Sequence, residues 1–167
     1  IYINNLLGKA SLENNYDIVK MLLEKGANPN LTDPGYGDGF TILHRAVYKG
    51  STEMVNLLVK NDADPNLHAK DGITPLLYSI QEYNLDIFNI LINNGADVNL
   101  VSKDSRELSP IWLSVYMYYA YLTDKETLPI FKEMIRILVD EGADPTKQIQ
   151  DKVEKFNEGV SALSMAY

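Results

Sequence analysis

The sequence contains no cysteine, which excludes disulfide bonds, thiolate zinc sites and cysteine nucleophiles. It has only two histidines, His44 and His68, and no cluster with the ligand spacing that zinc requires. Asp33 and Asp38 lie close together, but the alternating Asp/Asn pattern and terminal Glu of a calcium-binding loop are missing. We therefore predict neither a metal nor a cofactor, and we expect an intracellular, cytoplasmic protein.

Positive charge is also scarce. The chain has 15 Lys and Arg against 23 Asp and Glu, a formal net charge of -8 at pH 7, and no basic cluster. Such a surface repels a phosphate backbone, so we predict no nucleic-acid partner. No apolar run approaches the roughly 20 residues of a membrane-spanning helix, and no basic-then-apolar leader follows Ile1, so we predict no membrane insertion.

What the sequence does contain is one phrase that occurs four times. Each copy contains Ala followed by Asn or Asp. The copies are LLEKGANPN at 22–30, LVKNDADPN at 58–66, LINNGADVN at 91–99 and LVDEGADP at 138–145. From Ala63 to Ala96 the interval is 33 residues, and the neighbouring intervals are 36 and 47. A recurring phrase at such a period indicates a repeat array.

A second phrase keeps step with the first, and its copies read GFTILHRA at 39–46, GITPLLYS at 72–79, ELSPIWLS at 107–114 and GVSALSMA at 159–166. This phrase resembles the Gly-x-Thr-Pro-Leu-His-x-Ala signature of ankyrin repeats, whose period is also 33. The resemblance implies an all-α fold, an ankyrin-repeat solenoid of stacked helix-turn-helix units with finger loops. In such an array each unit buries its apolar face on its neighbours.

We expect a single ankyrin-repeat domain over 1–167, with about five units. These are 1–35, 36–68, 69–101, 102–146 with an enlarged helix pair, and a partial unit at 147–167. The chain has no initiating Met, opens inside an expected first helix and closes partway through another. We therefore predict a fragment of a longer array or of a multidomain protein.

Local signals place the helix ends and the core. A side chain able to cap each first helix stands at Asn5, Thr41, Thr74, Ser109 and Ser161. A stacked apolar ladder is expected at Leu7, Leu43, Leu76, Ile111 and Leu163. Second helices carry apolar stripes at Ile18, Val19, Leu22, Leu23, Met54, Val55, Leu57, Leu58, Ile87, Phe88, Ile90, Leu91, Met134, Ile135, Ile137 and Leu138. Left-handed residues should end those helices at Gly26, Asp62, Gly95 and Gly142.

The turn inside each helix pair is less regular, and it reads Asn14, Gly50, Tyr83 and Tyr118. Because Tyr with positive φ is costly, we expect a reshaped turn in the third and fourth units. In the fourth unit the interval from Ser109 to Gly142 is 33 residues, against 21 from Thr74 to Gly95. This predicts a protruding unit with a lengthened first helix, a polar turn capped by Thr127 and a second helix started near Pro129.

No catalytic constellation stands out. His44 occupies the signature His position, where the resemblance implies a structural ring that bridges the helix start to the neighbouring finger. His68 is expected to be a solvated finger residue. The stretch GYGDG at 35–39 lacks the Gly-Lys-Ser/Thr of a phosphate loop, and no carboxylate pair is marked by an apolar pocket. We predict that the chain is not an enzyme.

The resemblance implies instead a partner on the concave face formed by finger tips and first helices. The corresponding positions are Tyr36, Asp38, Phe40, Tyr48, Lys49, Lys70, Asp71, Ile73, Gln81, Glu82, Ser105, Arg106, Leu108, Tyr116 and Met117. Phe40, Ile73 and Leu108 either form an apolar binding strip or pack finger on finger. The tyrosines at 118, 119 and 121 either seal the protrusion or present a second binding patch.

The leading hypothesis is a noncatalytic protein–protein interaction module that is monomeric. One alternative is the substrate-recognition or targeting region of an enzyme whose catalytic domain lies outside the fragment. Another is a structural self-association module. The richness in Asn, Ile, Tyr and Lys suits an AT-rich genome, so one setting is a bacterial ankyrin effector that acts in the host cytosol.

Overall fold

The computed structural model describes residues 2–32, 37–104 and 106–146 of the chain. Within these ranges the chain forms eight α-helices and no extended strand, and one isolated antiparallel bridge pairs Thr32 with Thr41. The helices are α1 (Tyr2–Leu12), α2 (Tyr16–Glu24), α3 (Ile42–Tyr48), α4 (Thr52–Val59), α5 (Pro75–Gln81), α6 (Leu85–Asn93), α7 (Pro110–Ala120) and α8 (Leu128–Asp140).

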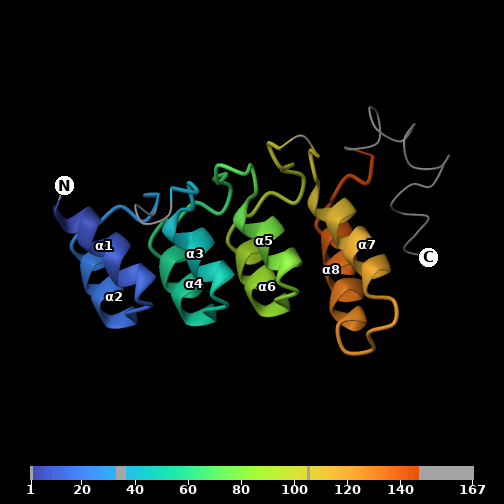
Figure 1. Cartoon of the computed structure of the whole chain (residues 1–167), viewed down its shortest axis with the longest axis horizontal. Helices are drawn as coiled ribbons and strands as arrows, with labels where there is room; N and C mark the ends of the chain where they lie inside the picture. The colour runs from blue at the N-terminus through green and yellow to red at the C-terminus, as the bar shows by residue number, and fades with distance from the viewer. Residues whose placement is uncertain (1, 33–36, 105, 147–167) are drawn as a thin grey trace.

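The helices form four pairs that stand in a row, with the loops between pairs along one edge (Figure 1). The first helices α1, α3, α5 and α7 contact one another in sequence, and the second helices α2, α4, α6 and α8 do the same. Each pair therefore packs mainly on its neighbours. This all-α stack confirms the predicted fold class, while the unit boundaries stay predictions.

The expected caps are present on three of the first helices. The side chains of Thr41, Thr74 and Ser109 each accept a hydrogen bond of 3.3 Å from the backbone N–H three residues later. The prediction for Asn5 was wrong, because α1 begins at Tyr2 and Asn5 lies inside it. Ser161 lies outside the described residues.

The apolar ladder is buried at its four described positions, Leu7, Leu43, Leu76 and Ile111, with exposed fractions of 0 to 2%. Leu163 lies outside the described residues. Most of the second-helix stripe is buried as well, with Ile90 and Ile137 partly so. The prediction was wrong for Ile18, which is exposed although Met54 and Ile87 at the same register of α4 and α6 are buried; α4 and α6 each pack on two other second helices, whereas α2 packs on α4 alone within the described ranges.

The repeated phrase also builds a ladder of asparagine side chains that joins each unit to the next. The Oδ1 atoms of Asn30, Asn66 and Asn99 accept the backbone N–H of residues 64, 97 and 144 at 2.6 to 2.8 Å. Their Nδ2 atoms donate to the carbonyl oxygens of residues 62, 95 and 142 at 2.9 to 3.1 Å. These carbonyls belong to the predicted left-handed residues, all of which have positive φ.

Two finger glycines allow neighbouring fingers to approach closely. Gly39 and Gly72 have φ of +73° and +79°, and a Cβ at Gly72 would lie 2.6 Å from the backbone nitrogen of Asp104. The fingers are joined there by backbone hydrogen bonds of 2.9 Å, from Lys70 N to Asp38 O and from Lys103 N to Gly72 O. Side chains at these glycines would separate the fingers.

The expected reshaping of the third unit's turn does not occur. Tyr83 takes the left-handed conformation, with φ of +42°, and keeps the hydrogen-bond pattern of the turn at Gly50. Its ring centroid lies 6.2 Å from that of Tyr121, which in turn lies 5.7 Å from Phe131. These ring contacts help to offset the backbone strain at Tyr83.

The fourth unit is enlarged as predicted. Helix α7 has 11 residues and α8 has 13, against seven to nine in α3–α6, and the pair extends beyond its neighbours (Figure 1). Tyr118 therefore lies inside α7 rather than in a turn. Thr127 precedes α8 but forms no side-chain cap bond; its backbone is helical, and its hydroxyl donates to Asp124 Oδ2 at 2.7 Å. Tyr121 fits the sealing alternative, while Tyr119 is 43% exposed.

Candidate protein-binding surface

Two exposed tyrosines stand out on the first helices. Tyr48 on α3 is 55% exposed and Tyr116 on α7 is 57% exposed. Each lies seven residues after the cap of its helix, Thr41 or Ser109, so the two occupy the same position in their units. We define the first-helix face by these residues and their equivalents, which are Tyr48, Lys49, Gln81, Glu82, Tyr116 and Met117.

The remaining members of this face are polar or only partly covered. Lys49 and Glu82 are exposed, and Gln81 and Met117 are half-buried. The Tyr116 ring stacks on that of Trp112, with the ring centroids 5.5 Å apart and an angle of 6° between the planes. A ring supported in this way loses little further freedom when it is covered by a partner.

The three apolar finger residues do not form an exposed strip. Phe40, Ile73 and Leu108 have exposed fractions of 6, 2 and 5%, so the expectation of an apolar surface line was wrong. Phe40 shows the reason, because its ring centroid lies 5.0 Å from that of Tyr78 and 5.5 Å from that of His44. These residues pack between fingers and helices, which was the alternative reading.

An aspartate braces each described finger tip. Asp38, Asp71 and Asp104 accept the backbone N–H two residues later at 3.0 to 3.1 Å, a local turn that Asp favours. The second carboxylate oxygen of Asp71 accepts from the Tyr78 hydroxyl at 2.5 Å, and that of Asp104 pairs with Arg106 at 2.6 Å. Asp104 was not anticipated, although its register with the other two aspartates is visible in the sequence.

These contacts explain the shifted pKa values of the finger groups. Burial raises the pKa of Asp38, but the Phe40 N–H and the Arg45 guanidinium outweigh it and hold the value below the usual range. Burial, followed by the hydrogen bond to Asp71, raises the pKa of the Tyr78 phenol. Asp38 is thus ionised and structurally engaged rather than prepared for proton transfer.

His44 is the structural histidine that the resemblance implied. Thr41 N donates to its Nδ1 at 3.2 Å, so the proton lies on Nε2, which donates to the carbonyl oxygen of Ile73 at 3.1 Å. Burial lowers the pKa of His44 to about 4, so the ring is neutral at pH 7. The prediction for His68 was wrong, because it is half-buried and its Nε2 lies 3.1 Å from the carbonyl oxygen of Val101.

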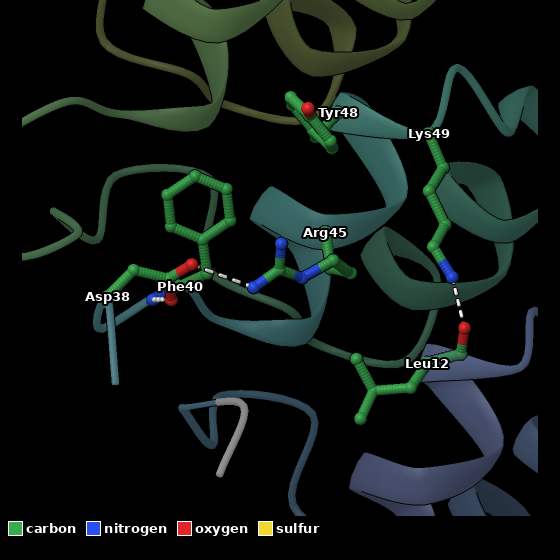
Figure 2. A pocket seen from close by; sticks show the side chains of 6 residues that line it. All are labelled: Leu12, Asp38, Phe40, Arg45, Tyr48 and Lys49. Carbon is green, nitrogen blue, oxygen red and sulfur yellow. Dashed lines mark hydrogen bonds and ion pairs between the residues drawn. The ribbon is translucent and has the colours of Figure 1, made fainter. Parts of the chain in front are cut away.

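A pocket of about 480 Å³ opens beside Tyr48, between the end of α1 and helix α3 (Figure 2). It is lined by Leu12, Asp38, Phe40, Arg45, Tyr48 and Lys49. The Arg45 guanidinium lies 4.6 Å from the centroid of the Phe40 ring and pairs with Asp38 at 2.8 Å. Figure 2 shows the Lys49 ammonium directed at the backbone carbonyl of Leu12, to which it donates a hydrogen bond.

The other predicted contact residues lie on the fingers. Lys70 is exposed, and its ammonium donates to the carbonyl oxygen of Gly37 at 2.6 Å. The Arg106 side chain is 58% exposed. Tyr36 and Ser105 lie outside the described residues. Leu12 and Arg45 were missed as contact candidates, and only the fold brings them together at one pocket.

Within the described ranges, no three His, Asp or Glu side chains gather as metal ligands would. None of the helices in these ranges is both long and apolar enough to cross a bilayer.

A family model described as "Ankyrin repeats (3 copies)" matches residues 7–102 of the chain. The chain belongs to the ankyrin repeat family. The matched residues run from within α1 to the segment after α6, so the ankyrin assignment covers the pocket and most of the first-helix face.

Similar proteins include a mammalian enzyme and ankyrin repeat proteins of two viruses. The human 2-5A-dependent ribonuclease is 42% identical over 69 residues, which is 41% of this chain and 9% of the ribonuclease. An ankyrin repeat protein of Acanthamoeba polyphaga mimivirus is 46% identical over 54 residues, which is 32% of this chain and 12% of the viral protein. One of fowlpox virus is 39% identical over 61 residues, which is 36% of this chain and 12% of the viral protein. The matches thus span about a tenth of these relatives.

Proposed function

We propose that this ankyrin array is a noncatalytic module that binds a partner protein through its first-helix face and finger tips. Ankyrin repeats generally mediate protein–protein interaction. The observation that carries the proposal is the shared position of Tyr48 and Tyr116, which expose more than half of their surface at the same register of α3 and α7.

The composition of the face supports this role. Tyr, Met and Arg are enriched in protein interfaces, and Tyr48, Tyr116, Met117 and Arg106 supply all three types. Burying an exposed Tyr ring against a partner removes a large apolar area from water at a small entropic cost. A repeat array also presents these side chains on a preformed scaffold, so little ordering is needed on binding.

The fingers divide into supporting and contacting residues. Phe40, Ile73 and Leu108 are buried and hold the finger shape, so they support the surface from below. Lys70, Asp71 and Arg106 are exposed and are the proposed finger contacts. Asp38 is partly covered by its pair with Arg45 and contributes mainly by orienting that guanidinium.

The proposal is tested by affinity capture from eukaryotic cell lysate with quantitative mass spectrometry. The bait is the chain itself, compared with a Tyr48→Ala, Arg106→Ala, Tyr116→Ala triple variant of matched circular dichroism. A Tyr16→Ala, Lys20→Ala variant on α2 serves as the control, because both residues are exposed on a second helix. We expect proteins that are lost with the triple variant alone. Equal capture by all three baits would contradict the proposed surface.

The enzyme-associated alternative has one specific observation in its favour, the match to the human 2-5A-dependent ribonuclease. Under this reading the array supplies recognition or targeting to a catalytic domain elsewhere in a longer protein. Ankyrin repeat proteins are typically noncatalytic, so the array itself would still act by binding. Sequencing the parent gene on both sides of this segment decides between the two readings.

We further propose that the array is intracellular and monomeric and binds no nucleic acid. The relatives reported above are mammalian and viral, so they lend no support to a bacterial setting. The structural alternative, self-association through the α7–α8 protrusion, requires a mass that rises with concentration. Light scattering over a concentration series tests this, since a constant monomer mass removes self-association.

A further inference from the structure

We propose that the pocket at Tyr48 receives a short acidic segment of the partner protein, in which an apolar side chain lies beside a carboxylate. This inference rests on the proposed protein-binding function and specifies its ligand chemistry. It is carried by the lining of the pocket and by the local balance of charge.

The walls of the pocket favour an apolar side chain. Leu12 from α1, the edge of Phe40 and the ring of Tyr48 line it, and its volume of about 480 Å³ falls in the usual range of ligand pockets. The Phe40 and Tyr48 ring centroids are 6.4 Å apart in an edge-to-face arrangement, which fixes the position of the exposed Tyr48 ring. An aromatic or branched aliphatic side chain would bury its surface against these groups.

The charges around the pocket favour an anion. Lys49 and Lys70 donate to backbone carbonyls, of Leu12 and Gly37, and neither forms an ion pair in the described part of the chain. A carbonyl satisfies a donor without neutralising the ammonium charge. Asp38 is paired with Arg45, while Asp71 accepts from the neutral Tyr78 hydroxyl and keeps its charge, so the cations Lys49, Lys70 and Arg45 still exceed these nearby carboxylates.

This cationic rim contrasts with the rest of the chain, whose net charge is -8. The overall negative charge discourages an extended polyanion, which must place many phosphates along the surface. A segment with one or two carboxylates beside an apolar residue needs only the local cations. The Lys49 ammonium can turn from the Leu12 carbonyl to such a carboxylate and form a charge-assisted hydrogen bond.

The test begins with selection of random linear peptides displayed on phage against the immobilised chain. The best-enriched peptide is synthesised, and its affinity is measured by fluorescence anisotropy for the wild type, Lys49→Gln and Tyr48→Ala. Lys20→Gln and Tyr16→Ala on α2 are the matched controls. A second peptide with its Glu and Asp replaced by Gln and Asn completes a double-mutant cycle with Lys49→Gln.

We expect enriched peptides to combine Asp or Glu with Phe, Tyr, Leu or Ile. Lys49→Gln and Tyr48→Ala should each weaken binding about tenfold, while the controls stay within about twofold of the wild type. The neutral peptide should bind wild type and Lys49→Gln equally, which shows that Lys49 acts on the carboxylate. Binding should also weaken as salt is raised.

Four results would overturn the inference. The first is enrichment of neutral or basic peptides, and the second is binding that Lys49→Gln leaves unchanged. The third is an absence of enriched peptides, and the fourth is displacement of the peptide by single-stranded RNA at equal concentration. If any of these occurs while the lysate capture still depends on Tyr48, Arg106 and Tyr116, the acidic ligand is wrong and the binding function stands. If both experiments fail, the binding function itself is wrong.

Discussion

The Nε2 atom of His44 lies 3.1 Å from the backbone carbonyl oxygen of Ile73, and this bond ties helix α3 to the finger of the next unit. Both groups are almost fully buried, and the bond joins residues of neighbouring units that are 29 positions apart in the sequence. The ring is neutral because it is buried, and its Nδ1 accepts from the Thr41 N–H, so protonation of this ring leads to a prediction about pH.

Acidification should weaken the array through His44. Its pKa is about 4 in the folded chain and about 6.5 when unfolded, so the unfolded state binds the extra proton between these values. The contribution of the neutral ring is therefore complete above about pH 6.5 and is lost as the pH falls toward 4. We expect the contribution of His44 to the free energy of unfolding to fall by about 2 kcal/mol between pH 7 and pH 5. Urea unfolding at the two pH values measures this change.

A His44→Gln variant provides the control for this titration. Its free energy of unfolding should be lower than that of the wild type at pH 7. The difference between the two free energies should be smaller at pH 5, because Gln does not titrate. His68 and the carboxylates are present in both proteins and cancel in the comparison. An unchanged difference between the two pH values would contradict the assignment to His44.

Removal of a cap residue that forms a side-chain hydrogen bond should destabilise the array more than removal of one that does not. Thr74→Ala deletes a side-chain acceptor at the start of α5 and should cost about 1 kcal/mol. Ser51 precedes α4 without a side-chain cap bond, so Ser51→Ala should cost much less. Urea unfolding at pH 7 measures both, and equal losses would show that the Thr74 bond contributes nothing.

The finger glycines should differ from the helix-end glycines in their tolerance of a methyl group. At Gly72 a Cβ would lie 2.6 Å from the backbone nitrogen of Asp104, whereas at Gly95 nothing lies within 4 Å. Both have positive φ, so Gly95→Ala should cost about 1 kcal/mol for backbone strain alone.

Gly72→Ala should cost about 3 kcal/mol or should increase hydrogen exchange at the amide of Lys103, which bonds to the Gly72 carbonyl. Thermal unfolding with hydrogen exchange measures both effects. Similar behaviour of the two variants would mean that finger contact adds no constraint beyond φ.

Tyr83 should show opposing effects of its backbone and its ring. Tyr83→Ala loses the contact with Tyr121 while keeping a side chain at φ of +42°, and it should cost about 1 kcal/mol. Tyr83→Gly loses the same ring but removes the strain, so it should be about 1 kcal/mol more stable than the Ala variant. Gly50→Ala places a side chain at the equivalent turn and should lower the free energy of unfolding by about 1 kcal/mol. Urea unfolding measures all three variants.

Much of the fold could be predicted because its signals are local. Three of these signals are visible within one unit. They are a hydroxyl three residues before its N–H partner, an apolar ladder position, and a left-handed residue after a helix. Thr41, Thr74 and Ser109 therefore cap as expected, and Asp62 takes the conformation that Gly has elsewhere. The misplaced cap at Asn5 shows the limit, since helix extension competes with a cap wherever both are sterically allowed.

The candidate site was only partly predictable, because exposure depends on neighbours from other units. Phe40 and Tyr48 are both aromatic and both occupy family contact positions, yet one is 6% and the other 55% exposed. Tyr78, which lies on the next unit and 5.0 Å from Phe40 between ring centroids, makes the difference. Nothing in the residues around Phe40 records that contact.

The sequence by itself therefore determined the repeat, three of the first-helix caps and most of the core register, because each follows from periodicity and short-range hydrogen bonding. The ankyrin resemblance added candidate positions for the proposed binding surface. The tertiary structure alone decided which of those positions are open, that Tyr83 remains left-handed against the Tyr121 ring, and that Leu12 and Lys49 meet at one pocket. Those outcomes depend on contacts between units, where side chains far apart in sequence compete for the same space.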